Sequence, residues 1–471
     1  MHRRSTYQNS IRKRKNTMKN TLKRGSIALG LGLMLTALCQ AQQENLQGAP
    51  SATPLSFKVP PHAFSAISFS TAPNAQCSVA PVTDNRSAKA FTVFANDEGT
   101  ATFYATPSKE SSAGRLVATC SPGNQQTIEI QPVAGAKPLV AHAASNDAEM
   151  NLRLGHTVRP ALTGDPMALS SEELVKRRYP SRPDQQQAPG AYADWLRAVS
   201  KPATFIPPKT VTVEGRHHGP VKVFAGPGGP AKVGNTPGGS TNWSGYVLSG
   251  LGVSKPFDWV EGLWNVPATV GGEEGTTTWS SFWIGLDGWD SSDVVQDGTN
   301  QNVTVSDGIA YRTYSPWTEI WPQELEQTIS NFNINPGDEI YSEVYMGDAN
   351  GDVNPWGGYG YFWFEDLTTD QYTFLSTQFD SGTYYGNNAE WIMERPSING
   401  VSGDYDDLSD YWYAVMQDPY ARTSDGYYTG YLGPGEGDNS YQLTMYNGND
   451  ALSTVYPINS NEMLFLWENY R

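Results

Sequence analysis

The chain has 471 residues and a formal net charge of −16, from 32 basic and 48 acidic side chains. This length exceeds what one compact domain usually holds, so two or more domains are expected. Glycine (46), tyrosine (25) and tryptophan (14) are abundant, which favours strands and tight turns, because aromatic side chains suit pleated surfaces and glycine accepts positive φ. The composition excludes a coiled coil, a collagen and a simple disordered chain.

The N-terminus has the pattern of an export signal. Basic residues run to Lys23-Arg24, and an apolar run of 13 residues follows, Ser26–Leu38, which is too short to span a membrane. Residues 1–41 are the predicted signal peptide, and Cys39 does not follow a small residue, which argues against a lipid anchor. We therefore expect a secreted protein, extracellular or periplasmic, with no membrane attachment in the mature form.

After the signal, residues 50–136 consist of short alternating runs such as Ala90–Phe94 and Thr127–Ile130, separated by turn residues. This pattern predicts a small antiparallel, immunoglobulin-like β domain. Removal of the signal leaves two cysteines, Cys77 and Cys120. An oxidising compartment favours a disulfide between them, and the alternative is two buried free thiols.

Residues 137–239 form a basic segment rich in Pro, Ala and Gly. Helical spacing and capping predict two short helices in it, Ser171–Arg178 and Ala191–Val199. Its basic clusters are Lys176-Arg177-Arg178 and Arg216-His217-His218, and its Gly/Pro-rich stretches are Gly226–Pro230 and Pro237–Gly239. The last two predict a flexible junction, where proteolytic cleavage concentrates.

Residues 240–471 are almost entirely strand and turn, with alternation at Ile340–Met346, Tyr359–Phe364 and Tyr441–Met445. This pattern predicts an antiparallel β-sandwich, jelly-roll or concanavalin-like. The predicted fold class is therefore all-β: this sandwich, preceded by the immunoglobulin-like domain and the Pro/Gly-rich basic linker.

The charge divides sharply near Thr236. The chain carries 27 basic and 14 acidic residues before it, and 5 basic and 34 acidic residues from it onward. An anionic domain binds nucleic acid poorly, because phosphate contacts require Lys and Arg. Its carboxylates repel one another at neutral pH, and protonation relieves that repulsion, so we expect a protein that works in acid and has no nucleic-acid partner.

All six histidines and all three cysteines precede Thr236. The last domain by itself therefore cannot be a hydrolase with a histidine base, and it cannot hold a zinc site built on Cys or His. Asp348–Asp352 begins like a calcium loop, but Val353 and Tyr359 stand where such a loop needs Gly and Glu. We therefore predict no metal and no cofactor, and carboxylate chemistry remains. That chemistry serves either glycoside hydrolysis or peptide hydrolysis, and composition does not choose between them.

Four groups of motifs between residues 242 and 396 bear on this choice. They are Asn242-Trp243-Ser244-Gly245-Tyr246 with Trp264-Asn265-Val266-Pro267, Trp283-Ile284-Gly285-Leu286-Asp287-Gly288 with Val294-Val295-Gln296-Asp297-Gly298, Trp317-Thr318-Glu319-Ile320-Trp321-Pro322, and Asn388-Ala389-Glu390-Trp391-Ile392-Met393-Glu394. In residue type and order these segments resemble the glutamic peptidases, also called eqolisins.

The resemblance implies that Gln296 and Glu394 are catalytic. Glu394 would act as general base toward a water, and Gln296 would donate to the developing oxyanion. The resemblance also implies that the substrate cleft is lined by Trp243, Trp283, Asp287 and Glu319. A carboxamide does not titrate, and a Glu of ordinary pKa, about 4.3, stays partly ionised in acid, so this pair suits a low pH.

Two neighbours of Glu394 carry further expectations. Glu390 lies four residues earlier, so both carboxyls point to the same side of a strand, and one of the two is expected to be structural. Arg395 follows Glu394 directly, and its charge is expected to depress the pKa of that carboxyl.

Together these observations predict a secreted glutamic endopeptidase that hydrolyses protein or peptide substrates in acid and is monomeric. It is expected to be made as a zymogen, whose basic segment neutralises the acidic cleft until acid and cleavage near the Gly/Pro junction release it. The alternative is a carbohydrate-active or carbohydrate-binding β-sandwich protein, which the Trp and Tyr content also fits.

Overall fold

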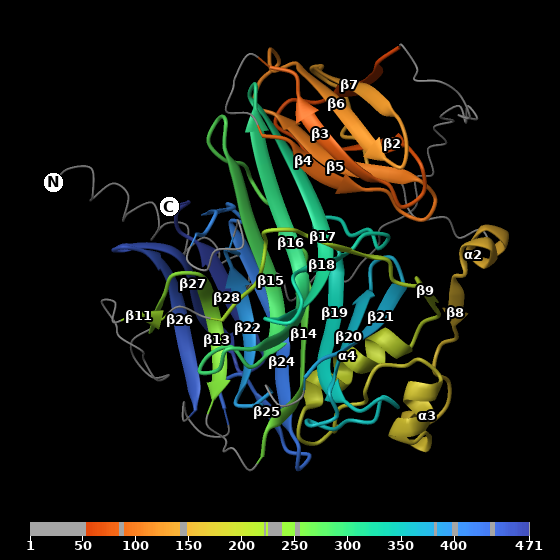
Figure 1. The fold of residues 1–471 in the computed structure, drawn as a ribbon, viewed down its shortest axis with the longest axis vertical. Coiled ribbons are helices and arrows are strands. Elements are labelled where there is room, and N and C mark those ends of the chain that lie inside the picture. The colour runs from red at the N-terminus through yellow and green to blue at the C-terminus, as the bar shows by residue number, and fades with distance from the viewer. Residues whose placement is uncertain are drawn as a thin grey trace. The chain divides into compact units, whose positions relative to one another are not determined.

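The computed structural model describes residues 53–83, 89–141, 148–220, 223–224, 238–249, 255–380, 384–397, 404–433 and 439–470. The predicted signal peptide and the Gly226–Pro230 stretch lie outside these residues. Contacts divide the chain into two units, Met1–Gly48 and Ala49–Arg471, and the second is the one described below. Strands dominate it (Figure 1), which confirms the all-β prediction. The sandwich and immunoglobulin-like assignments and the domain boundaries stay predictions.

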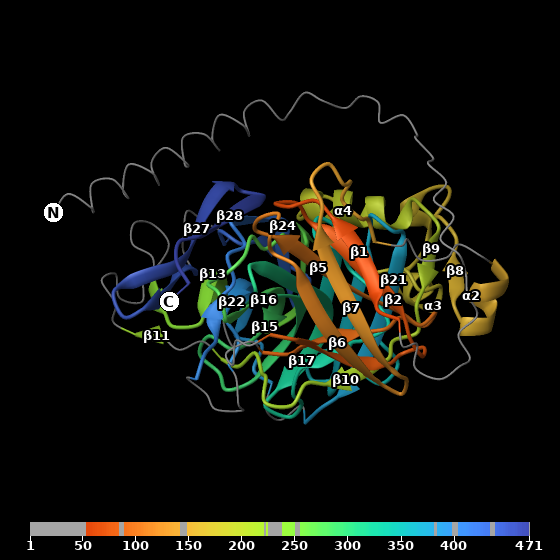
Figure 2. The same cartoon turned by 90° about the horizontal axis from the view of Figure 1, so that it is seen from above.

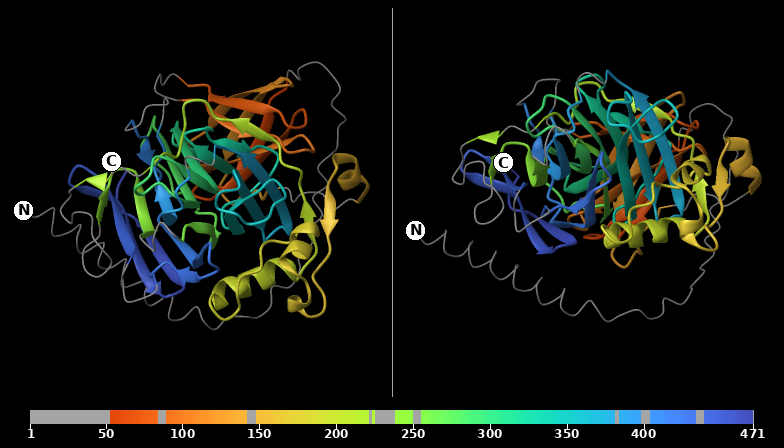
Figure 3. Two further views of the ribbon diagram at one scale, coloured as in Figure 1. Left: turned by 60° about the horizontal axis from the view of Figure 1, so that its bottom comes forward. Right: turned by 90° about the horizontal axis from the view of Figure 1, so that it is seen from below.

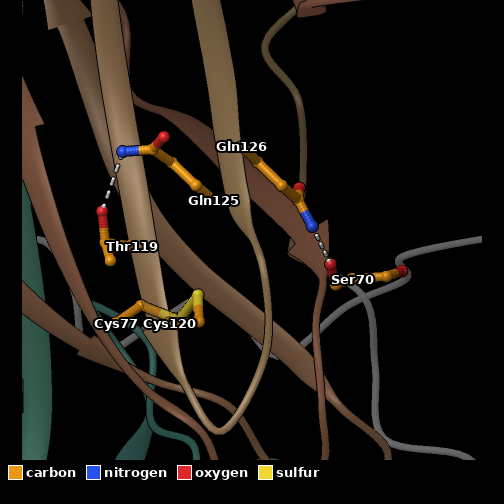
Figure 4. Close-up of a disulfide and its surroundings, with 6 residues drawn as sticks. All are labelled: Ser70, Cys77, Thr119, Cys120, Gln125 and Gln126. Atoms are coloured by element: carbon orange, nitrogen blue, oxygen red, sulfur yellow. Dashed lines mark hydrogen bonds between the residues drawn. A yellow bond between two sulfur atoms is a disulfide. The ribbon is translucent and has the colours of Figure 1, made fainter. Parts of the chain in front are cut away.

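The N-terminal strands form a five-stranded sheet and a separate ladder. The sheet has the order β1 (Leu55–Val59), β7 (Gln125–Pro132), β6 (Gly114–Ser121), β3 (Gln76–Pro81) and β4 (Phe91–Phe94), and the ladder pairs β2 (Ser65–Ser70) with β5 (Thr100–Pro107). Cys77 and Cys120 lie opposite each other on β3 and β6 and form a disulfide (Figure 4).

The basic segment is folded against the strands that follow it. It contains α2 (Ala148–Leu154), β8 (Thr157–Arg159), the 3₁₀ turn Pro166–Ala168, α3 (Ser171–Lys176), α4 (Pro189–Val199), β9 (Ala203–Phe205) and β10 (Thr210–Thr212). Both predicted helices are confirmed, and the Ser170 side chain caps α3 by accepting from the Glu173 N–H. None of the helices in the described ranges is long and apolar enough to cross a membrane.

The C-terminal strands pair in two series (Figures 1 and 2). The first is β17 (Ile309–Trp321), β16 (Val294–Ser306), β15 (Thr277–Leu286), β22 (Asn388–Glu394), β13 (Trp243–Ser249) and β26 (Ser440–Asn447). The second is β21 (Gln371–Gln378), β20 (Tyr359–Asp366), β19 (Glu339–Gly347), β14 (Phe257–Asn265), β24 (Tyr413–Thr423), β28 (Glu462–Trp467) and β27 (Asp450–Asn459). Short strands complete them: β11 (Val223–Phe224), β12 (Gly238–Ser240), β18 (Gln327–Ile329), β23 (Asp407–Leu408) and β25 (Tyr428–Gly430).

Strand alternation gives the first series two different faces, because successive side chains point to opposite sides. In β16, Val295 belongs to the large hydrophobic core that the two series share, with Phe282, Val344 and Phe364 among its members. The opposite face holds a smaller apolar cluster built on Trp243, Trp283 and Trp317. Gln296 therefore lies on the face away from the main core.

Candidate active site

Five neighbouring strands of the first series bring the predicted residues together. Glu394 on β22 lies opposite Trp243 on β13, and Gln296 on β16 lies opposite Gly285 on β15 and Glu319 on β17. All these positions share the face away from the main core. Gln296, Glu319 and Glu394 are fully buried.

Two glycines let the strands beneath the site approach closely. A β-carbon at Gly298 would lie 2.4 Å from the Cβ of Trp283, and one at Gly285 would lie 3.1 Å from the Cβ of Gln296. Any side chain at Gly298 would therefore displace the Trp283 ring, and one at Gly285 would press on Gln296. Both glycines therefore leave room for the side chains of the predicted site.

Trp283 positions the predicted base. Its indole Nε1 donates to Glu394 Oε2 at 2.8 Å, and its ring meets Trp243 edge to face with the centroids 4.9 Å apart. Burial raises the pKa of Glu394, while nearby His218 and the two indoles lower it, and the net result is a pKa above the ordinary value. This carboxyl is thus held by donors that favour its ionised form.

His218, from the basic segment, lies in the middle of this site. The Gln296 amide donates to the His218 carbonyl oxygen, and the His218 N–H donates to Glu319 Oε2 at 2.8 Å. Its imidazole Nδ1 lies 3.0 Å from Glu394 Oε2, and Nε2 lies 3.2 Å from Glu326 Oε2. One residue therefore contacts both members of the predicted dyad.

We call residues 216–219 the plug. Its three side chains lie over indole rings: Arg216 over Trp279 with the guanidinium 3.7 Å from the centroid, His217 over Trp321 at 4.1 Å, and His218 over Trp317 at 3.7 Å. Arg216 Nη1 also lies 3.3 Å from Glu326 Oε2. The plug thus covers an aromatic and anionic surface, and Arg216 and His218 are its cationic side chains.

Glu326 is the anionic centre under the plug, and sequence analysis did not single it out. Its oxygens also accept from Asn300 Nδ2 at 2.9 Å and from Thr328 Oγ1 at 3.0 Å. Burial raises its pKa, but Arg216 and then His218 outweigh burial and hold the pKa at about 2. The only signal for this pairing in the sequence is the cluster Arg216-His217-His218.

Asp287, which was predicted to line the substrate cleft, binds backbone groups of the segment before β22. Its carboxylate accepts four backbone N–H groups, those of Tyr385, Gly386, Asn387 and Asn388. Burial raises its pKa to about 6 against these hydrogen bonds. It therefore organises the turn that leads into β22 and contacts no dyad residue.

We expect Asp287→Ala to lower the free energy of unfolding by about 3 kcal/mol, because it leaves several buried N–H groups without an acceptor. Asp287→Asn, which keeps one acceptor oxygen, should cost about half as much. Urea unfolding followed by tryptophan fluorescence measures both. Unchanged stability together with a raised KM would return Asp287 to substrate binding.

The neighbours of Glu394 also differ from expectation. Arg395 donates to the Thr241 carbonyl at 2.8 Å, and the cation on Glu394 is His218 instead, so the expected depression of the Glu394 pKa by Arg395 is wrong. Burial and nearby acidic residues, first Asp287, raise the pKa of Glu390 well above its usual range. Glu390 is therefore a neutral buried acid.

The predicted acidic turn carries no metal cluster. Asp348 Oδ1 accepts from the backbone N–H of Asn350 at 2.8 Å and of Asp352 at 3.3 Å, as in an Asx turn. Across the described ranges, no three His, Cys, Asp or Glu side chains are grouped so as to hold a metal ion.

Comparison with known proteins bears on this site. Residues 241–463 match the model of the Peptidase A4 family. Among solved structures, scytalido-glutamic peptidase with a transition state analog inhibitor is 24% identical, with a TM-score of 0.39, over 48% of this chain and 98% of that one. SCP-B, described as an eqolisin in complex with a tripeptide Ala-Ile-His, is 21% identical, with a TM-score of 0.36, over the same shares. Comparison with curated proteins gave no significant match. Residues 241–463, slightly less than half of the chain, are therefore similar to the Peptidase A4 family, the glutamic peptidases or eqolisins, and the match supports a glutamic endopeptidase domain in this part of the chain.

Proposed function

We propose that the chain is an exported acid endopeptidase that hydrolyses protein substrates with Gln296 and Glu394, and that it is made as a zymogen. In this proposal the two series of C-terminal strands are the layers of an antiparallel β-sandwich, and one layer carries the dyad. One observation carries the proposal: the Gln296 amide donates to the carbonyl oxygen of His218, and the Glu394 carboxylate contacts the imidazole of the same residue.

The chemistry follows from these positions. Ionised Glu394 takes a proton from a water that attacks the substrate carbonyl carbon, and later returns it to the leaving amine. Gln296 Nε2 donates to the carbonyl oxygen as negative charge develops on it. Gln296 Oε1 accepts from no described residue and is available to orient the water. Trp283 holds Glu394 in place.

The plug supports the zymogen part of the proposal, because it occupies the positions that a substrate needs. Nine of the 27 basic residues before Thr236 precede Gly25 and leave with the predicted signal. The total charge of the segment therefore matters less than the few cations that contact the acidic site. The charges that matter are those of Arg216 and His218 on the buried Glu326 and Glu394.

Acid loosens this contact through Glu326. A carboxyl whose pKa falls to about 2 in the docked state favours docking above its ordinary pKa of about 4.3 and loses that contribution as pH falls toward 2. Burial lowers the pKa of His218, but Glu326 and Glu394 raise it to about 9. His218 therefore stays charged in acid, and its contribution is lost only as pH rises through 9.

Substitution of the dyad tests the proposed activity. After acid treatment, the wild type should digest a reduced, unfolded protein at about pH 3 to 4, below the ordinary Glu pKa. Gln296→Ala should lower the rate by about 10² to 10³, and Glu394→Ala by about 10² to 10⁴. Gel and mass analysis of the fragments measures the rate. Undiminished proteolysis by either variant would rule out the dyad, and polysaccharide cleavage without proteolysis would favour the carbohydrate alternative.

A further inference from the structure

We propose that the peptide bond between His218 and Gly219 is the first bond that the enzyme cuts in its own chain. This inference rests on the proposed dyad and names the site on which the dyad first acts. The predicted place of cleavage was the Gly/Pro junction further along the chain.

The carbonyl of this bond lies where a substrate carbonyl belongs. Gln296 donates its amide hydrogen to the His218 oxygen, which is the atom that becomes the oxyanion when water adds. Glu319 Oε2 accepts the His218 N–H at 2.8 Å and fixes the peptide unit that precedes the bond.

The residue before His218, His217, forms an isolated antiparallel β-bridge with Ser397. The His217 N–H donates to the Ser397 carbonyl at 3.3 Å, and the Ser397 N–H donates to the His217 carbonyl at 3.1 Å. Ser397 lies three residues beyond Glu394. Backbone pairing of this kind is how extended peptides dock on a sheet edge, so the plug is held as a substrate would be.

Gly219, on the other side of the bond, also fits this reading. A β-carbon there would lie 3.0 Å from His217 Nδ1, so the plug conformation favours a residue without a side chain. While the His218 imidazole binds Glu394 Oε2, that oxygen cannot take a proton from a water. The bond therefore stays uncut until the ring moves away.

The reaction balances without an external reagent. Water oxygen bonds to the His218 carbonyl carbon, and Glu394 takes the water proton. The bond from that carbon to the Gly219 nitrogen breaks, and the proton passes to this nitrogen. The products are a His218 carboxyl and a Gly219 amine. The new carboxylate forms on the residue whose ring contacts Glu394, and Glu394 is ionised again once the proton has passed to the amine, so like charge favours departure of the product.

The test maps the first termini that form in acid. Full-length protein is diluted into buffers of about pH 2.5, 3 and 4, which lie between the docked and the ordinary pKa of Glu326. The buffers are made with ¹⁸O water, and the samples are quenched over time and analysed by mass spectrometry. The earliest products should be a ¹⁸O-labelled C-terminus at His218 and an N-terminus at Gly219. Because the bond lies in the cleft of its own molecule, the first-order rate constant should stay constant over a 50-fold range of protein concentration. Glu394→Gln should form neither terminus.

A first cut elsewhere, or a rate constant that rises with concentration, would overturn the inference. Failure of the proposed function is a different result: no cleavage of the chain and no digestion of an added unfolded protein.

We further infer that the N-terminal part, residues 53–209, stays bound to the catalytic domain after this cut. The evidence is an interface separate from the plug. Strand β5 extends the catalytic sheet by pairing with β17, with Ala105 opposite Tyr311. All cysteines lie before Thr236, so no disulfide links the two parts, and retention depends on this interface.

The two parts share one hydrophobic core. Ile309 and Tyr311, at the start of β17, are buried among the side chains of the N-terminal strands. The Tyr311 ring stacks on Phe91 with the centroids 5.6 Å apart. Buried Arg312 donates to Thr106 Oγ1 at 2.9 Å. Separation would expose this apolar surface and the edge of the catalytic sheet.

A second anchor lies on β8. The Arg159 guanidinium binds the Glu365 carboxylate with two hydrogen bonds, of 3.0 and 2.7 Å, and both side chains are buried. Removal of the N-terminal part would leave Glu365 without this cation. Loss of one partner of a buried pair is costly, so this contact also favours retention.

Helix α4 adds an anchor that strengthens in acid, and it lies against β14 and β24 (Figure 3). Asp194 on α4 faces Asp418, with Glu261 and Glu339 nearby and Arg197 as the cation on its own helix. Burial, followed by Asp418, raises the Asp194 pKa to about 7. Docking that raises the pKa of a carboxyl grows stronger as pH falls through that value. Acid therefore tightens α4 while it loosens the plug.

Retention has a consequence for substrates. A cavity of about 450 Å³ is lined by Phe91 and Tyr104 of the N-terminal part and by Trp279, Asn302 and Tyr314 of the catalytic sheet. Arg216 of the plug lies at the same cavity. The retained part therefore still forms one wall of this cavity after the plug has moved out.

The experiment does not depend on self-processing. A recognition site for a sequence-specific protease is inserted between Gly228 and Gly229 in the Glu394→Gln protein, and the chain is cut at pH 7. Size-exclusion chromatography at pH 7 and pH 4 should show both fragments in one 1:1 peak at micromolar concentration. Ile309→Asp should separate them, whereas Val270→Asp, at a position that is 55% exposed, should not.

Separate peaks from the cut protein at pH 4 would overturn retention. Separation by Val270→Asp as well as by Ile309→Asp would show that the shared core is not the anchor. The Glu394→Gln background keeps this result independent of the proposed activity.

Discussion

Glu394→Gln should lower kcat for proteolysis by about 10² to 10⁴, whereas Glu390→Gln should change it by less than about threefold, which corresponds to about 0.7 kcal/mol. The two residues lie on one strand and one face, both are fully buried, and both changes replace a carboxyl by an amide of the same shape. Comparison of the two variants therefore separates the effect of losing an ionisable group from the effect of changed packing.

The difference arises from the environments of the two carboxyls. Burial, with the acidic residues Asp287, Asp290 and Asp293, raises the pKa of Glu390 well above its ordinary value. This shift favours the neutral form in acid, which glutamine imitates. Burial also raises the pKa of Glu394, but His218 and the indoles, with Trp283 donating at 2.8 Å, oppose that shift and favour the ionised form that a base needs. Glutamine there has no basic oxygen of comparable strength.

The measurement is the initial rate on an unfolded protein from pH 2.5 to 6 with acid-treated enzyme. Thermal unfolding should shift by only a few degrees in each variant. Equal losses in the two variants would mean that Glu394 acts through packing, and a larger loss in Glu390→Gln would transfer the role of base to that residue.

The dyad was within reach of the sequence through the resemblance of its motifs to the glutamic peptidases. Strand alternation explains why both residues lie on one face of the sheet once the strands pair. Arg395 shows the limit of adjacency in sequence: on a strand the next residue points to the other side, and its cation does not reach the carboxyl of Glu394.

His218 and Glu326 were out of reach for a different reason. They are separated by 108 residues, and they meet because the basic segment crosses the cleft. The cluster Arg216-His217-His218 was visible only as charge. The absence of histidine after Thr236 remains true of the sequence, yet a histidine from before that point lies on the predicted base. The histidine count of residues 236–471 therefore does not describe this site, because His218 from the basic segment is part of it.

Our last prediction concerns this residue. His218→Ala should give the full-length protein 10- to 100-fold more activity at pH 5 to 6 in the first minute after dilution, before processing. The substitution removes the contacts of the ring with Glu394 and Glu326. Hydrogen bonds to charged groups contribute about 1.5 to 3 kcal/mol, and 1.4 kcal/mol changes an equilibrium tenfold. Cleavage of a quenched fluorescent peptide measures the rate.

His217→Ala is the matched control, because it removes the neighbouring imidazole, which stacks on Trp321 and not on a dyad residue. It should change the initial rate less than threefold, since the charged contacts to Glu326 and Glu394 remain. Equal activation by both variants would mean that the plug is held by aromatic stacking, and no activation by His218→Ala would mean that Arg216 and the backbone contacts suffice. In the expected case, one imidazole, buried between two carboxyls of another domain, decides when the Gln296 and Glu394 pair becomes accessible.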